Sequence, residues 1–168
     1  DAAQLLLPTI RSRCLAHTMA WPAEPEALAW LAGQGVAAGA GAAALRAAGG
    51  RPSSALTWAA DKDSASQWAA LPRAMARGDV AALAPLSLPE AVDCLQKLCH
   101  DLLARQLGAA PRFFDPADLP ARALPLAALT RWWKLLAESA RSAEHPLNAG
   151  LATEFLVSSA HQALNSKS

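Results

Sequence analysis

The chain has 168 residues, of which 53% are hydrophobic, so it can bury a core as one domain or as two small ones. Its 15 Lys and Arg against 14 Asp and Glu give a net charge of +1, which argues against autonomous nucleic-acid binding. No apolar run approaches the roughly 20 residues of a membrane span, and no secretory signal pattern is present, so we expect a cytoplasmic protein. Alanine and leucine dominate and tyrosine is absent, which predicts an all-α fold.

The first 22 residues do not resemble a domain of their own. The sequence starts at Asp1 rather than Met and within an Ala- and Leu-rich pattern, so we expect residues 1–22 to be the end of a larger upstream domain. Residues 5–10 should end a helix. Residues 14–19 should be extended before Trp21, which precedes a proline and is therefore disfavoured in the α region.

Residues 23–61 predict three short helices. The first, from Glu24, has an apolar face of Ala27, Leu28, Trp30 and Leu31 and ends at glycines 33 and 35. The other two are expected over 37–48, before a Gly-Gly pair, and over 52–60, where the proline suits a first turn. The polar residues 61–64 are the expected linker to the next unit.

Residues 62–168 predict about five antiparallel helices. A helix over 67–77 should be interrupted at Pro72, and the strongest apolar stripe runs over 88–107. A proline-rich loop over 109–125 should be anchored by Phe113 and Phe114. Helices are then expected over 125–140 and from the N-cap residue Asn148 to residue 164.

One short stretch resembles a known functional motif. Residues 6–14 read Leu-Leu-Pro-Thr-Ile-Arg-Ser-Arg-Cys, which is similar to the Ser-Arg-Cys motif of clamp-loader ATPase subunits in the AAA+ family. The resemblance implies that Arg13, between Ser12 and Cys14, is a trans-acting arginine finger that stabilises charge during phosphoryl transfer at a neighbouring subunit's ATP. Arg11 lies outside the three-residue motif and is at most supporting.

The same resemblance implies a division of the chain. Residues 1–22 would end the AAA+ nucleotide-binding domain, residues 23–61 would form a three-helix lid, and residues 62–168 would form the helical collar through which subunits assemble. Residues 148–156 also resemble, loosely, the last collar helix of the family.

A second stretch departs from the family pattern. Residues 49–56 resemble the lid segment Gly-Ser-x-Arg-Asp-Ala-Leu, whose arginine senses the subunit's own ATP, but Ser53 stands at that arginine's position. Arg51 lies two residues away, about 200° around a helix, and should not substitute. The chain also has no phosphate-binding Gly-x4-Gly-Lys-Ser/Thr loop, so we expect no ATP hydrolysis and no cofactor of its own.

The resemblance therefore implies a non-catalytic stator subunit, with ATP bound by its neighbours. The implied partners are the motor subunits and the delta subunit, reached through the collar, with the sliding clamp and primed DNA joining only in the assembled complex. Two alternatives stay open. The parent could be an ATP-hydrolysing motor subunit, against which Ser53 argues, or the chain could be an unrelated α-helical scaffold whose Ser-Arg-Cys is accidental.

Other candidate sites are weak. The three cysteines are expected to be reduced, and no Cys-x-x-Cys or His-x3-His spacing predicts zinc; the family's zinc ligands lie upstream. Cys99 and His100 face apart on a helix and should be a core thiol and a solvent histidine. Trp132 and Trp133, beside Arg131 and a lysine, suggest a base-stacking platform or a partner anchor. We favour Trp133 in the core and Trp132 at a domain or subunit contact.

Overall fold

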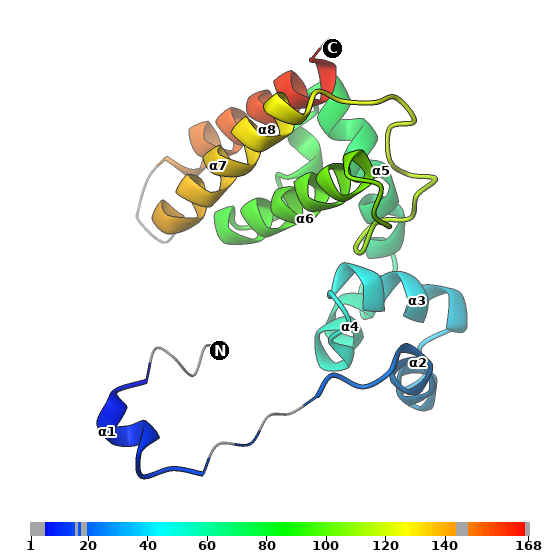
Figure 1. The fold of residues 1–168 in the computed structure, drawn as a ribbon. Coiled ribbons are helices and arrows are strands. Elements are labelled where there is room, and N and C mark those ends of the chain that lie inside the picture. Colours follow the sequence, from blue (N-terminus) through cyan, green and yellow to red (C-terminus); the bar gives the residue numbers. More distant parts are fainter. Residues whose placement is uncertain (1–5, 16, 18–19, 144–147, 167–168) are drawn as a thin grey trace.

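A computed structural model describes residues 6–15, 17, 20–143 and 148–166. These residues form helices and turns and no strand, so the predicted all-α class is confirmed (Figure 1). The elements in chain order are α1 (Pro8–Arg11), α2 (Glu24–Gly33), α3 (Ala38–Ala47), α4 (Pro52–Ala59), α5 (Ser64–Arg77), the 3-10 turn η2 (Val80–Ala82), α6 (Leu88–Gln106), α7 (Leu126–Ser142) and α8 (Ala149–Asn165). None of the described helices is both long and apolar enough to cross a bilayer.

Helices α2, α3 and α4 pack around a small core of their own. Its buried residues are mostly alanine, with Leu31 and Leu45 as the larger members. Alanine-rich surfaces allow the helix axes to come close. Gly35 ends α2 as predicted, since it has φ +88° and its N–H donates to Ala32 while Val36 N–H reaches back to Leu31. Trp30 is 43% exposed, so the prediction that it belongs to the apolar face of this helix is wrong.

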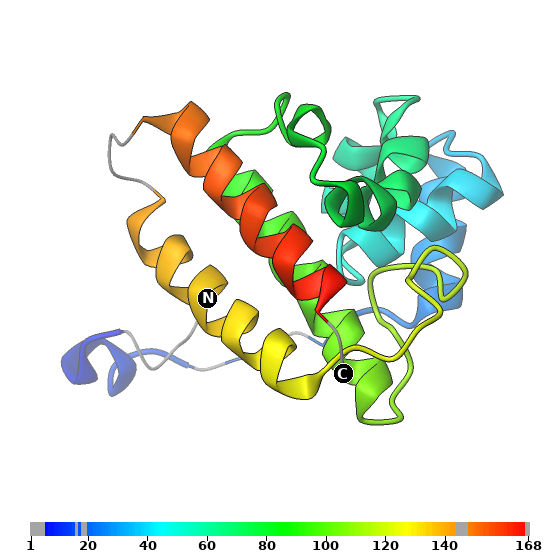
Figure 2. The same ribbon diagram turned by 90° about the horizontal axis from the view of Figure 1, so that it is seen from above.

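Helices α5 to α8 surround a second, larger core. Helix α6 packs against α7 and α8, and α5 packs against α8 (Figures 1 and 2). Figure 2 shows α7 and α8 side by side and antiparallel. The predicted helices over 88–107, 125–140 and 148–164 are all present within one or two residues, but the described part of this unit holds four α-helices and a 3-10 turn rather than about five helices.

Helix α5 is continuous through Pro72, contrary to the predicted interruption. A proline inside a helix removes one backbone hydrogen bond and crowds the preceding turn. The turns on both sides are held by burial, because Leu71, Pro72, Ala74 and Met75 are all buried against the second core. Tertiary packing therefore outweighs the local break, and the helix ends at Arg77 as predicted, with Gly78 (φ +73°) as its C-cap.

The linker predicted over residues 61–64 is a tight turn between α4 and α5. The Asp61 carboxylate accepts the Asp63 N–H at 3.0 Å and the Ser64 hydroxyl at 3.2 Å. Such side-chain hydrogen bonds to nearby backbone are typical of Asp at turns. The two helical units are thus joined by a short and locally ordered connection.

Helix α6 begins with a side-chain cap. The Glu90 carboxylate accepts the Ser87 hydroxyl at 2.6 Å and the Ser87 backbone N–H at 2.8 Å. These two hydrogen bonds lower the pKa of Glu90, because they favour its charged form. Together with Pro89 in the first turn, the cap explains why the helix starts at Leu88.

Candidate functional site

The segment that carries Arg13 stands apart from both cores. Pro8 supplies the first turn of α1, a four-residue helix that buries none of its residues. After it, the Ser12 hydroxyl donates to the Thr9 carbonyl at 3.2 Å and the Arg13 N–H donates to Ile10 at 3.1 Å. Ser12, Arg13 and Cys14 are all exposed. The chain therefore presents the arginine on a short turn without burying it.

The apolar residues of this segment are exposed as well. Leu7 is 65% exposed and Leu15 is 98% exposed, and Leu6 and Ile10 are also on the surface. A short stretch of exposed leucine and isoleucine side chains normally marks a surface that contacts another domain or another protein. Arg11 is exposed in the last turn of α1. The predicted extended segment over 14–19 falls partly outside the described residues, which include neither residue 16 nor residues 18 and 19.

The second motif lies at the start of α4. Arg51 occupies the N-cap position, and its guanidinium carbon lies 5.6 Å from the centre of the Trp21 ring. Ser53 is exposed in the first turn of α4. The arginine at 51 therefore covers an aromatic side chain, and residue 53 presents a short hydroxyl side chain to solvent.

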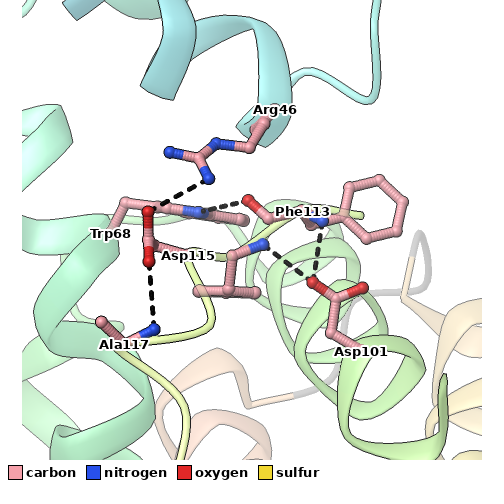
Figure 3. A network of polar contacts seen from close by, with 7 residues as sticks. Arg46, Trp68, Asp101, Phe113, Asp115 and Ala117 are labelled. Atoms are coloured by element: carbon pink, nitrogen blue, oxygen red, sulfur yellow. Dashed lines mark hydrogen bonds and ion pairs between the residues drawn. The ribbon is translucent and has the colours of Figure 1, made fainter. Parts of the chain in front are cut away.

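The two helical units are joined by an ion pair at their junction. The Arg46 guanidinium of α3 donates to the Asp115 carboxylate at 3.2 Å, and both side chains are between a third and a half exposed (Figure 3). The Ala117 N–H, which donates to the other carboxylate oxygen at 3.0 Å, lowers the pKa of Asp115, and Arg46 lowers it further. The acid therefore stays charged opposite its arginine in neutral solution.

A second contact at the junction involves the loop over residues 109–125. The Arg112 guanidinium donates to the Gly49 carbonyl at 3.0 Å. Gly49 has φ +65°, and a Cβ atom placed there would lie 3.2 Å from the Phe113 ring. Glycine is therefore required at 49 both by the left-handed backbone and by the close ring.

The loop itself is held by a buried carboxylate. Asp101 of α6 is fully buried and accepts the N–H groups of Arg112, Phe113 and Phe114 at 2.8–2.9 Å. Figure 3 shows Asp101 beneath the loop with its hydrogen bond to Phe113. His100 Nδ1 lies 2.9 Å from the same carboxylate. The anchoring of this loop by its two phenylalanines is confirmed for Phe114, which is buried, and in part for Phe113, which is half-buried.

Sequence reasoning missed Asp101, although a signal was present. A carboxylate between Leu98 and Leu102, on the apolar stripe of a long helix, is out of place unless it is buried with hydrogen-bond donors. Its donors are backbone groups 11 to 13 residues away in the loop, which no side-chain pattern reveals. His100 is exposed and Cys99 buried, as predicted.

The two adjacent tryptophans are placed opposite to the prediction. Trp132 is 3% exposed and belongs to the second core, whereas Trp133 is 39% exposed. The buried face of α7 runs through Leu129, Trp132 and Leu136, spaced by three and four residues, which leaves Trp133 about 100° away. The choice of Trp132 as the contact residue for a partner is therefore wrong.

The cysteines differ sharply in environment. Cys14 is exposed, whereas burial raises the pKa of Cys94 to about 11 and that of Cys99 to about 12. Cys99 Sγ lies 3.5 Å from the Leu129 carbonyl, to which it donates. Within the described residues, no group of three or more His, Cys, Asp or Glu side chains is arranged to hold a metal ion.

The exposed segment with Arg13 thus has the character of a functional site, whereas the contacts at the junction hold the two helical units together. Comparison with known proteins adds no family to these observations, since no protein-family model and no curated protein matches the chain.

Proposed function

We propose that the chain is the lid and collar of a delta-prime-type subunit of the bacterial DNA polymerase III clamp loader. Such a subunit is a non-ATPase stator that supports ATP-driven loading of the sliding clamp onto primed DNA during replication. The observation that carries the proposal is the exposed Arg13 within the Leu-Pro-Thr-Ile-Arg-Ser-Arg-Cys run, on the turn after a short helix that buries none of its residues. An unburied arginine in this context is free to address another subunit.

In this proposal the guanidinium of Arg13 lies beside the γ-phosphate of ATP bound by the neighbouring motor subunit. A guanidinium offers a planar fork of donors to phosphoryl oxygens and stabilises the charge that develops there during transfer. The exposed leucines of the same segment would pack against the nucleotide-binding domain expected upstream. The chain contributes this one group and is not itself catalytic, although its assembly would belong to a DNA-directed DNA polymerase, a nucleotidyltransferase.

The start of α4 favours a stator over a motor subunit. A motor subunit needs an arginine that reaches its own nucleotide from the lid, and the corresponding position here is Ser53. Arg51 is engaged over Trp21 instead. The junction supports the same role, because the Arg46–Asp115 ion pair and the Arg112–Gly49 hydrogen bond oppose rotation of the lid against the collar.

The decisive experiment is steady-state ATPase of a loader reconstituted from the intact subunit, its motor subunits and the delta subunit, with clamp and primed DNA. Arg13→Ala should fold and assemble normally but lower ATP hydrolysis, because one of the sites loses its arginine finger. Arg13→Lys should rescue poorly, since an ammonium lacks the guanidinium fork.

Arg11→Ala is the matched control, because it removes an exposed arginine from the same segment outside the three-residue motif. It should keep near wild-type turnover. If the Arg13→Ala loader hydrolysed ATP at the wild-type rate, Arg13 would have no role in hydrolysis, and the proposal would lose its main support.

A simpler experiment uses the chain alone. With no phosphate-binding loop and a net charge of +1, it should bind neither fluorescent ATP nor primed duplex DNA at moderate salt. Micromolar ATP binding by the chain would contradict the stator proposal.

A further inference from the structure

A groove lies along the antiparallel pair α7 and α8, and Leu88 at the start of α6 also lines one end of it. It consists of three adjoining hollows of about 80, 440 and 750 Å³. The first and second share Arg131 and Leu135, and the second and third share Ser139 and Phe155. Neighbouring hollows therefore adjoin at these shared residues.

The centre and one end of the groove are apolar although they face solvent. Phe155 is 55% exposed and Leu151, one turn earlier on α8, is 66% exposed. Both line the largest hollow, and Leu135 of α7 lines the other two. Large apolar side chains that gather at one concave surface mark a contact site for another protein more often than an isolated exposed leucine does.

The charges along the groove are separated by sign. Arg131 and Lys134 lie on the side of Leu135 toward the start of α7, and Glu138 and Glu154 lie toward its end. Residues 131, 135 and 138 follow a helical spacing of four and three and so share a face of α7. None of these four charged side chains takes part in an ion pair among the described residues. Each is available to an outside partner.

We propose that this groove is an interface for a second copy of the same chain, docked antiparallel about a two-fold axis beside Leu135 and Phe155. A two-fold axis reverses the direction of the groove, so the positive end of one copy meets the negative end of the other. Arg131 and Glu138 are seven residues apart, about 10 Å along α7, and lie on either side of Leu135. With the axis across the groove and in the plane of the interface, α7 lies against α7 of the partner, so the Arg131–Glu138 pair forms twice and both phenylalanines lie near the centre.

Complementarity of charge is what selects this occupant. In the other face-to-face arrangement, with the two-fold axis along the groove, α7 of one copy would lie against α8 of the other, and Arg131 would not meet Glu138. An unrelated helix would have to carry its own matching sequence of charges, whereas the second copy carries it already. This proposal does not depend on the proposed role in a clamp loader.

The test is sedimentation velocity of the 168-residue chain over a concentration series. We expect a reversible monomer–dimer equilibrium that weakens as salt is added, since exposed charge pairs are screened. Phe155→Ala should weaken the dimer on the order of thirtyfold, as for a central aromatic contact. Leu107→Ala is the matched control, because Leu107 is 72% exposed outside the groove and should have no effect.

Charge reversal provides a second test that does not depend on apolar contacts. The double variants Arg131→Glu with Lys134→Glu, and Glu138→Lys with Glu154→Lys, should each be monomeric. When mixed, they should form a one-to-one heterodimer, because the opposite signs are restored across the axis. All four side chains are exposed, so circular dichroism melting should match wild type.

A wild-type chain that stays monomeric at the highest attainable concentration would overturn the proposal. So would equal weakening by Phe155→Ala and Leu107→Ala, or a mixture of the two charge-reversed variants that fails to associate.

Discussion

Trp58 of α4 and Trp68 of α5 meet edge to face, with ring centroids 6.4 Å apart and planes at 87°. Trp68 also stacks on Phe114, with centroids 4.4 Å apart, and its indole N–H donates to the Phe113 carbonyl at 3.2 Å. One side chain therefore connects the first helical unit, the second core and the loop between α6 and α7.

Replacing Trp68 should destabilise both units together. Trp68→Ala removes two aromatic contacts and a hydrogen bond from a half-buried position, and we expect a loss of about 3 kcal/mol in the free energy of unfolding. Urea denaturation followed by circular dichroism measures it. Trp30→Ala is the control, because that side chain is 43% exposed and should change stability by about 0.5 kcal/mol or less. Equal losses in the two variants would contradict this account of the junction.

The buried carboxylate of Asp101 should be required for the order of its loop. Asp101→Ala leaves three backbone N–H groups without their acceptor, and each such group costs about 1–3 kcal/mol when it stays buried. We expect a loss of about 3 kcal/mol and faster hydrogen exchange at the amides of Phe113 and Phe114. Asp93→Ala, which removes a mostly exposed partner of Lys97, should cost about 1 kcal/mol or less. Unchanged exchange at the two phenylalanines in Asp101→Ala would show that the loop is held by other contacts.

The adjacent tryptophans of α7 should respond very differently to truncation. Trp132→Ala creates a cavity in the second core and should cost about 3–5 kcal/mol. Trp133→Ala acts at a partly exposed position and should cost less than about 1 kcal/mol. Melting temperatures and urea midpoints of the pair are directly comparable, because both variants make the same chemical change on the same helix. A larger loss of stability for Trp133→Ala than for Trp132→Ala would show that α7 turns the opposite tryptophan towards the core.

The three thiols should react at different rates with a disulfide reagent at pH 8. Cys14 is exposed and should react rapidly, whereas burial raises the pKa values of Cys94 and Cys99 to about 11 and 12 and leaves few thiolates to react. We expect one fast thiol in the native chain and three in urea. Three equally fast thiols before denaturant is added would show that the second core opens readily.

The same two shifts predict how stability depends on pH. A thiol whose pKa is raised by folding holds its proton more tightly in the native state. The contribution of such a thiol to the free energy of unfolding is fully present below the ordinary thiol pKa of 9.0. It is lost as the pH rises towards 12. Unfolding free energy should therefore fall over this window, and Cys94→Ala with Cys99→Ala should reduce the fall.

The sequence pattern predicts the helices well because their signals are local. Apolar spacing, the cap at Ser87 and the left-handed glycines 35 and 78 depend only on residues within a few positions. The pattern fails where two adjacent residues fit the apolar face of a helix equally well. Leu129 and Leu136 allow either Trp132 or Trp133 between them at helical spacing, and only packing against α6 and α8 decides.

The junction between the two helical units could not be predicted from the sequence, because it also depends on tertiary contacts. Arg46 and Asp115 are 69 residues apart in the chain, and neither occurs in a recognisable motif. Pro72 shows the opposite case, a strong local signal that burial on both sides overrides. Arg13 belongs to a third class. It was found from a motif, and its role stays a prediction because the atoms it would act on belong to another molecule.

The pairing of α5 with α8 brings together the first and last helices of the second core. At the end of α8, His161 Nδ1 and the Asn165 side-chain amide both lie within 2.9 Å of the Ala76 carbonyl near the end of α5. During synthesis, α2 to α4 can fold as soon as they leave the ribosome, but α5 must wait for more than 80 residues before its partner emerges. Throughout that interval the apolar face of α5, with Leu71 and Met75, lacks its α8 partner. Until α8 is complete, part of the second core of the nascent chain stays uncovered, which favours aggregation.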